Sequence, residues 1–166
     1  MSRPFQVAAA VPAQLPEIRD IYNEVIRNST AVFSDIEVTL ENRKEWFDAK
    51  TAAGFPVLVA AGPGGVVGFG TFGEFRSWPG YRFSVEHSVH VRADCRGRGV
   101  GRALVAALLE EAARMHKHTM IGGIDAQNVT SISLHEKLGF KPAGELREVA
   151  FKFGRWLDLK FMQRLI

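Results

Sequence analysis

The amino-acid sequence predicts a mixed α/β domain in which helices cover a sheet. Strand-like segments with alternating or continuous apolar residues are interleaved with segments whose apolar residues recur at helical spacing. Two of the strand-like segments flank Pro63-Gly64-Gly65, a combination typical of an antiparallel hairpin. With 166 residues, 46% of them hydrophobic, the chain is long enough for one domain with its own core, and we expect that domain to span 1–166.

The first elements are a strand followed by two helices. Residues 5–10, FQVAAA, are predicted to form a strand, and 12–28 a helix, because apolar residues there recur every three or four positions. A polar loop is expected over 28–38. Thr39 then begins a second helix over 40–52, because a threonine oxygen can accept a hydrogen bond from a free N–H group of the first helical turn.

The middle of the chain predicts a run of three strands. Residues 56–62 and 65–75 form the hairpin, and 76–80, RSWPG, form a turn. The next strand, 81–91, alternates between two faces. One face carries Phe83, Val85, His87, Val89 and Val91, and the other, more polar face carries Ser84, Glu86, Ser88 and His90.

The last part of the chain predicts two helices and three strands. A loop rich in glycine and arginine precedes a helix whose apolar face comprises Leu104, Val105, Leu108, Leu109 and Ala112. A strand over 119–125 is followed by a helix over 128–140 that ends at Gly139, since glycine commonly follows the last helical residue. Two strands are expected within 144–166, on either side of Gly154.

Composition and charge narrow the classes of function. The net charge of +3 and the pI of about 9.2 permit an anionic ligand without requiring nucleic acid. A single cysteine excludes an intrachain disulfide framework and fits a reducing compartment. No apolar run approaches the ~18 to 20 residues of a membrane span, and the N-terminal residues do not resemble a signal peptide. We therefore expect a cytoplasmic protein with no nucleic-acid or membrane partner.

The segment 96–101, RGRGVG, has the composition of an anion-binding loop. Its glycines let backbone N–H groups approach an anion, and the following helix adds free N–H groups and the positive end of its dipole. Arginine side chains supply positive charge at Arg92, Arg96, Arg98 and Arg102. The glycine spacing fits neither a Walker loop nor a dinucleotide fingerprint. The alternative is a glycine-rich turn with solvated arginines.

A second element narrows the ligand of this loop. Downstream of R-x-x-G-x-G stand Asn128, Ser131 and His135, followed by LGF at 138–140, in the order and spacing of the GNAT acetyltransferases. The sequence resembles that superfamily over most of its length. Segments that look like its phosphinothricin N-acetyltransferase branch, which includes methionine sulfoximine and methionine sulfone acetyltransferases, are 21–47, 81–104, 134–140 and 151–163.

The resemblance implies the GNAT acyl-CoA N-acyltransferase fold, with a mixed, mostly antiparallel sheet flanked by helices. It also implies acetyl-CoA as co-substrate and no metal. The residues that it assigns to cofactor binding are Val89, His90, Val91, Arg96, Gly97, Arg98, Gly99, Val100, Gly101, Asn128 and Ser131. For Asn128, capping of the following helix is the alternative.

Acetyl transfer to an amine needs a base for the amine and a proton for the leaving thiolate. Glu86, in mid-strand, matches the family position of a base that acts directly or through one water; the alternative is a glutamate paired to an arginine. His135 stands where the wider superfamily has tyrosine, and imidazole can protonate a thiolate, relay a proton or only pack. Cys95 is not expected to act as a nucleophile, nor His116 and His118 as metal ligands.

The resemblance also suggests how a small amino-acid-like substrate is recognised through its α-amine and carboxylate. Arg76 can hold a carboxylate with two hydrogen bonds, and the other predicted substrate residues are Phe33, Ser77, Tyr81 and Arg82. Phosphinothricin, methionine sulfoximine and methionine sulfone are the expected acceptors, and the protein is expected to be a homodimer. The alternatives are a protein or peptide N-terminal acetyltransferase and a non-catalytic acyl-CoA sensor.

Overall fold

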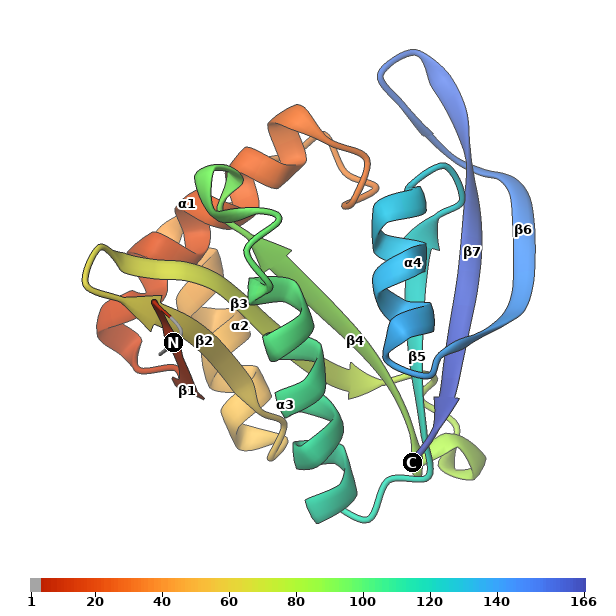
Figure 1. Ribbon diagram of the computed structural model, residues 1–166, viewed down its shortest axis with the longest axis horizontal. Helices are drawn as coiled ribbons and strands as arrows, with labels where there is room; N and C mark the ends of the chain where they lie inside the picture. The colour runs from red at the N-terminus through yellow and green to blue at the C-terminus, as the bar shows by residue number, and fades with distance from the viewer. Residues whose placement is uncertain (1–3) are drawn as a thin grey trace.

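A computed structural model describes residues 4–166 and arranges them around a seven-stranded sheet (Figure 1). The strand order is β1-β2-β3-β4-β5-β7-β6, and each neighbouring pair is antiparallel except β4 and β5, which are parallel. The predicted mixed, mostly antiparallel sheet is therefore confirmed. The strands are β1 (Gln6–Ala9), β2 (Val57–Gly62), β3 (Gly65–Glu74), β4 (Ser84–Val91), β5 (Thr119–Asp125), β6 (Lys141–Lys152) and β7 (Arg155–Leu165).

Helices cover both faces of this sheet. They are α1 (Leu15–Asn28), α2 (Leu40–Ala52), α3 (Val100–Arg114) and α4 (Val129–Lys137). The apolar residues of α1 and α2 pack with Val59 and Phe69, whereas α3 and α4 belong to the core around Leu58 and Phe72. Neighbouring residues of one strand thus serve opposite cores, as the alternation of a strand requires. None of these helices is long and apolar enough to cross a membrane.

Two glycines of β3 let α3 lie close to the sheet. A Cβ atom on Gly68 would stand 2.9 Å from Val100 Cγ1, and one on Gly70 would stand 3.1 Å from Leu108 Cδ1. Larger residues at these positions would push away the helix that begins at the glycine-rich loop. The glycines of β3 therefore set the height of that loop above the sheet.

The pairing of β4 with β5 ends halfway along both strands. The register runs from Ser84 opposite Thr119 to His87 opposite Gly122, and no pairing follows. Beyond this point 88–91 remain paired only with β3, and 123–125 only with β7. Figure 1 shows the two strands diverging on the side where α4 lies. We call this opening, between 88–91 of β4 and 123–125 of β5, the fork.

Local signals in the sequence predicted most element boundaries. The Thr39 side chain accepts a hydrogen bond from the Asn42 N–H group, as expected of a helix cap. Gly139 has a φ of 83° after α4, and Gly154 has a φ of 72° in the turn between β6 and β7. The predicted helix over 128–140 ends earlier, at Lys137.

Three further boundaries differ from the prediction, by three residues each. The strand expected over 81–91 begins at Ser84, because Pro79–Tyr81 form a 3₁₀ turn in which the Tyr81 N–H donates to the Trp78 carbonyl. The first of the two C-terminal strands begins at Lys141, because its pairing with β7 extends to Gln163. The first helix is preceded by a separate 3₁₀ turn, Pro12–Gln14.

Candidate active site

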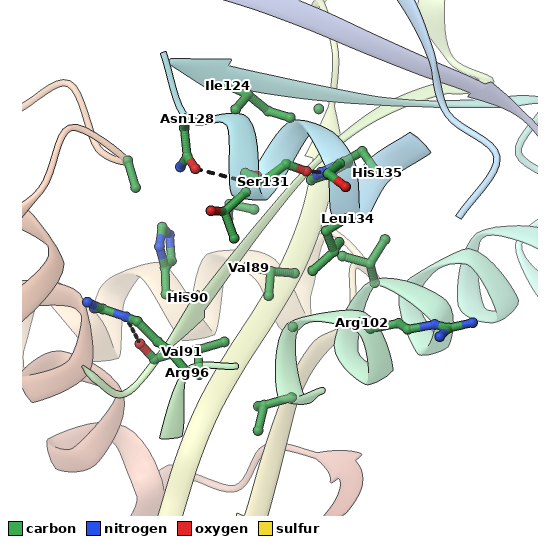
Figure 2. A pocket seen from close by; sticks show the side chains of 18 of the residues that line it. Val89, His90, Val91, Arg96, Arg102, Ile124, Asn128, Ser131, Leu134 and His135 are labelled. Carbon is green, nitrogen blue, oxygen red and sulfur yellow. Dashed lines mark hydrogen bonds between the residues drawn. The ribbon is translucent and has the colours of Figure 1, made fainter. Parts of the chain in front are cut away.

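A cavity of about 1050 Å³ opens at the fork. Figure 2 shows α4, with Asn128 and Ser131, on the opposite side of it from His90 and Arg96. Of the predicted cofactor-binding residues, those that line it are Val89, His90, Val91, Arg96, Gly97, Gly99, Val100, Gly101, Asn128 and Ser131. His135 lines it as well, whereas Arg98 is exposed outside it. The separation of two parallel strands thus creates space beside the glycine-rich loop.

The glycine-rich loop ends in a helix N-terminus at the cavity. Gly97 and Gly99 have φ angles of 75° and 82°, a region that glycine enters without strain. The first bond of α3 runs from the Ala103 N–H to the Gly99 carbonyl, so the preceding N–H groups lack an acceptor one turn back. These groups and the helix dipole make this end of the cavity suited to a phosphate.

The arginines of the loop have different roles. Arg96 lines the cavity, and its guanidinium donates to the Val91 carbonyl and to a carboxylate oxygen of Glu24 on α1, at 2.5 Å. Arg92 instead forms a two-bond ion pair with Asp94 and reaches the turn between β2 and β3. Arg102 lines the cavity. Arg96 and Arg102 are therefore the arginines placed to meet an anion there.

Asn128 caps α4 at the rim of the cavity. Its side-chain carbonyl accepts a hydrogen bond from the Ser131 N–H at 3.1 Å, drawn as a dashed line in Figure 2. The capping interpretation is confirmed. The amide NH₂ of the same side chain is not used in the cap and can donate to a ligand.

Glu86 is half-buried behind the fork. It lies opposite Gly73 on β3 and Ile121 on β5. Gly123 lines the cavity, and a Cβ atom there would stand 3.0 Å from Glu86 Oε1. Burial raises the pKa of Glu86, and the nearby Arg76 guanidinium lowers it. A carboxylate with a raised pKa beside a glycine opening is suited to accept a proton from a ligand in the cavity.

Two buried histidines form a pair next to this opening. His135 Nδ1 lies 2.7 Å from the Ser131 carbonyl, so we assign its proton to Nδ1. His135 Nε2 lies 3.0 Å from His87 Nε2 and then accepts the proton of His87. A Cβ atom on Gly122 would stand 3.0 Å from His87 Nε2 and 3.2 Å from His135 Nε2, so a larger residue there would have to displace one of the rings. Both ring nitrogens of His135 are therefore engaged.

Burial keeps these rings uncharged. Burial, and then the neighbouring His135 and His90, lower the pKa of His87 to about 3. The pKa of His135 is also lowered by burial. His87 Nδ1 is buried without a hydrogen-bond partner among residues 4–166.

His90 was expected on the more polar face of its strand, but it is buried. Its ring packs against Tyr22 of α1 and Phe69 of β3, with centroid distances of 5.2 and 5.3 Å. Burial, followed by the charges of Arg43 and Arg96, lowers the pKa of His90 to about 4. The face of β4 that holds Glu86 therefore packs against α1 at the other end of the strand, where His90 lies.

Acid is expected to destabilise the protein because His87 and His90 are uncharged when folded. Their folded-state pKa values of about 3 and about 4 lie below the unfolded value of about 6.5. The unfolded chain therefore binds more protons between these values, and stability is lost as the pH falls below about 6.5. We expect about 2 kcal/mol per histidine to be lost between about pH 7 and about pH 5. Urea unfolding measures this loss; equal free energies of unfolding would contradict it.

None of the five predicted substrate residues lines the cavity. Arg76 stacks on Phe75, 4.2 Å from its ring centroid, and Tyr81 packs edge-on against the same ring. This cluster lies on the Glu86 side, since Phe75 also packs against Phe161, and both Phe161 and Glu86 lie within 4 Å of a Cβ atom on Gly123. Arg82 instead donates to the Pro79 carbonyl within its own turn. Ser77 is exposed, and Phe33 is half-buried between α1 and α2.

Several lining residues were not predicted. They include Val25 of α1, Ser29 and Ala31 after its end, His87 and Ser88 of β4, residues 122–125 of β5, and residues of α4 other than Ser131 and His135. The adjacent glycines of β5 carried a usable signal, because glycine inside a strand often marks a close approach of backbone or ligand. Residues 4–166 contain no group of three or more metal-binding side chains close enough to share an ion.

Known protein sequences match nearly the whole chain. Residues 17–140 match the model of the Acetyltransferase (GNAT) family. An L-methionine sulfoximine/L-methionine sulfone acetyltransferase of Pseudomonas paraeruginosa is 47% identical over 91% of this chain and 88% of its own length. A phosphinothricin N-acetyltransferase of Alcaligenes faecalis is 36% identical over 90% of this chain and 77% of its own.

Solved structures agree with this assignment. A putative acetyltransferase of Salmonella typhimurium, solved with acetyl-CoA, has a TM-score of 0.95 and 42% identity over 98% of this chain and 94% of its own. A ribosomal-protein-alanine N-acetyltransferase of Brucella melitensis has a TM-score of 0.95 and 45% identity over 97% of this chain and 99% of its own. The predicted fold and enzyme class are confirmed. The chain belongs to the GNAT acetyltransferase family.

Proposed function

We propose that this protein transfers the acetyl group of acetyl-CoA to the α-amine of a small amino-acid-like substrate, such as methionine sulfone, methionine sulfoximine or phosphinothricin. The observation that carries the proposal is the fork: an anion-binding helix N-terminus lines its cavity, and the Glu86 carboxylate lies directly behind Gly123 of the same cavity. Relatives named for these substrates cover most of the chain. The cavity volume of about 1050 Å³ is large enough for an extended cofactor arm.

The residues of the cavity fit acetyl-CoA. The N–H groups that begin α3, with Arg96 and Arg102, suit a pyrophosphate. Alternate backbone groups of 88–91 face the fork rather than β3, so they are available to the amides of a pantetheine arm. The Asn128 amide lies across the cavity from them.

Within this proposal Glu86 removes the proton from the substrate ammonium, directly or through one water. The free amine then attacks the thioester, and a backbone N–H group of 88–91 donates to the carbonyl oxygen as its charge develops. Transfer is direct, and no metal takes part. The domain spans 1–166.

His135 is placed to hold the fork rather than to donate a proton. Its Nδ1 proton is bound to the Ser131 carbonyl, and its Nε2 faces His87. Donation to a leaving thiolate requires breaking one of these contacts. We therefore propose that His135 positions α4 against β4, and that the proton lost by the attacking nitrogen as the tetrahedral intermediate collapses reaches the thiolate through a water in the cavity.

The proposal extends to a cytoplasmic homodimer. The arm formed by β6 and β7 exposes Leu146, Val149, Phe151, Phe153 and Trp156. Apolar side chains gathered on one protruding hairpin favour coverage by another subunit.

The function is tested by release of free thiol from acetyl-CoA across a panel of amines. We expect methionine sulfone, methionine sulfoximine and phosphinothricin to stimulate release, and simple alkylamines without a carboxylate to stimulate it little. Stimulation by none of the amines would favour a non-catalytic acyl-CoA sensor.

Protein or peptide N-terminal acetylation is the second candidate, because the Brucella melitensis relative is named for ribosomal-protein alanine. Its acceptor lacks the free carboxylate that Arg76, on the Glu86 side, is proposed to bind.

Methionine sulfone is expected to be acetylated about tenfold more efficiently than its C-terminal amide, as befits loss of one charged hydrogen-bonding interaction. Arg76→Gln is expected to remove this preference, and Arg114→Gln, on the exposed side of α3, to keep it. The measurement is kcat/KM for both acceptors. Equal values with the unmodified protein would contradict the binding of the substrate carboxylate by Arg76 and would favour a peptide substrate.

A further inference from the structure

Lys152, the last residue of β6, is a buried ammonium group with three carbonyl acceptors. Only 1% of the residue is exposed. Its Nζ donates to the carbonyls of Ile26 and Ser29 at 2.7 Å each and to that of Val32 at 2.9 Å. An ammonium has three protons, so its hydrogen-bonding capacity is used in full.

These acceptors belong to the end of α1 and the segment after it. The last carbonyls of a helix have no intrahelical partner, and the negative end of the helix dipole favours a cation there. Lys152 lies at the tip of the β6–β7 hairpin. It directly precedes the turn residues Phe153 and Gly154, both with positive φ. Figure 1 shows the β6–β7 tip next to the chain that leaves α1.

The segment 29–33 also forms a hydrogen bond with β5. The Thr30 hydroxyl donates to a carboxylate oxygen of Asp125, at the end of β5. Ser29, Ala31 and Asp125 line the cavity, whereas Lys152 does not. The segment is thus one wall of the cavity, bound to β5 through Thr30 and held from outside by Lys152.

This wall is not held by regular secondary structure. Residues 29–39 form neither helix nor strand, so their backbone carbonyls need partners outside regular structure. Burying a charge is costly unless it is fully hydrogen-bonded, and an apolar side chain would fill the same space without that cost. The ammonium contributes what an apolar side chain lacks, which is a fixed position for three carbonyls.

We infer that the amine substrate binds against 29–33, and that Lys152 is a positioning residue that holds this wall of the cavity in place. The expected change in the KM of the amine rests on the proposed function. The expected change in the hydrogen exchange of 29–33 does not. Acetyl-CoA binding depends on α3, α4 and the fork, which Lys152 does not touch, so the two substrates should respond differently.

The test uses Lys152→Met, which removes the ammonium and keeps the length of the side chain. Lys160→Met is the matched control, because Lys160 is on the other strand of the same hairpin and pairs with Glu145. Thr30→Val removes the second attachment of the segment and serves if Lys152→Met does not fold. Each variant is assayed for KM of both substrates, and for hydrogen exchange of the amides of 29–33.

We expect Lys152→Met to raise the KM for methionine sulfone about tenfold, as for loss of one buried interaction. The KM for acetyl-CoA should stay within about twofold, and exchange in 29–33 should accelerate. Thr30→Val should also raise the KM for methionine sulfone and accelerate exchange in 29–33, whereas Lys160→Met should change neither of these two quantities. Unchanged exchange and an unchanged amine KM in a folded Lys152→Met protein, or in Thr30→Val, would overturn the inference.

The exchange measurement separates this inference from the proposed function. If the unmodified protein acetylates no amine, the proposed function fails, and exchange alone decides the role of Lys152. Faster exchange in 29–33 with Lys152→Met, but not with Lys160→Met, would then still support the positioning of the wall. Unchanged exchange would overturn it independently of any activity.

Discussion

Replacing Glu86 by glutamine is expected to lower kcat/KM for the amine by about 10²-fold or more at neutral pH, the contribution typical of a general base. Glutamine keeps the size of the side chain but cannot accept the ammonium proton. Acetyl-CoA affinity should remain nearly intact, because Glu86 is not among the residues that line the cavity proposed to bind acetyl-CoA. The measurement is steady-state kinetics with each substrate varied.

The pH profile provides a second readout for the same substitution. Because burial raises the pKa of Glu86, kcat/KM of the unmodified protein should fall on acidification at a pH above the usual range of a glutamate. In Glu86→Gln this fall of kcat/KM on acidification should disappear. Glu110→Gln, on the exposed side of α3, should keep both the rate at neutral pH and the fall on acidification. A Glu86→Gln protein with an unchanged rate would remove Glu86 from the role of base.

Replacing Gly101 by valine is expected to raise the KM for acetyl-CoA by about 10²-fold, through loss of one or two hydrogen bonds to a charged group. Gly101 lies in the first turn of α3 and lines the cavity. Its φ is not positive, so the backbone accepts a side chain, and a Cβ atom would meet Leu134 Cδ1 at an ordinary 3.4 Å. The larger valine side chain would occupy space that the phosphate needs.

Gly144→Val is the control for this substitution. A Cβ atom on Gly144 of β6 meets nothing within 4 Å, and its φ is also not positive. It should leave the KM for acetyl-CoA unchanged. Unaltered acetyl-CoA affinity in a folded Gly101→Val protein, measured by calorimetry, would contradict a phosphate site at the start of α3.

The glycine-rich loop and the cap of α4 were predictable from the sequence because their signals are local. Gly97 and Gly99 report a backbone conformation that few other residues adopt, and Asn128 caps the helix that it precedes. Each of these residues lies within a few positions of the element that it shapes. The order of loop, strand and capped helix then identified the family.

The rest of the site depends on contacts between distant parts of the chain. His87 meets His135 only because β4 and β5 are parallel neighbours with α4 above them, and no pattern in the sequence reports that pairing. Lys152 looks like an ordinary polar residue of a hairpin until the tip is placed against α1. The burial of His90 was not predicted for the same reason, since it comes from Tyr22, far away in sequence.

The substrate residues were the least predictable. Arg76 and Tyr81 were proposed from a short aromatic turn, and in the structure they cluster around Phe75 beside Glu86, outside the cavity. The cavity instead receives Ser29 and Ala31 from a segment without regular structure. Such a segment has no periodicity from which its position can be inferred.

The central claim is direct acetyl transfer to an α-amine, and one rapid-quench experiment tests it most directly. The protein is mixed with an equal amount of acetyl-CoA, methionine sulfone is added afterwards, and free thiol, Nα-acetylated product and acetylated protein are measured throughout. We predict no thiol release before the amine is added, and equal amounts of thiol and Nα-acetylated product after it. Thiol released before the amine together with acetylated protein, or no N-acetylated product after it, would contradict this mechanism.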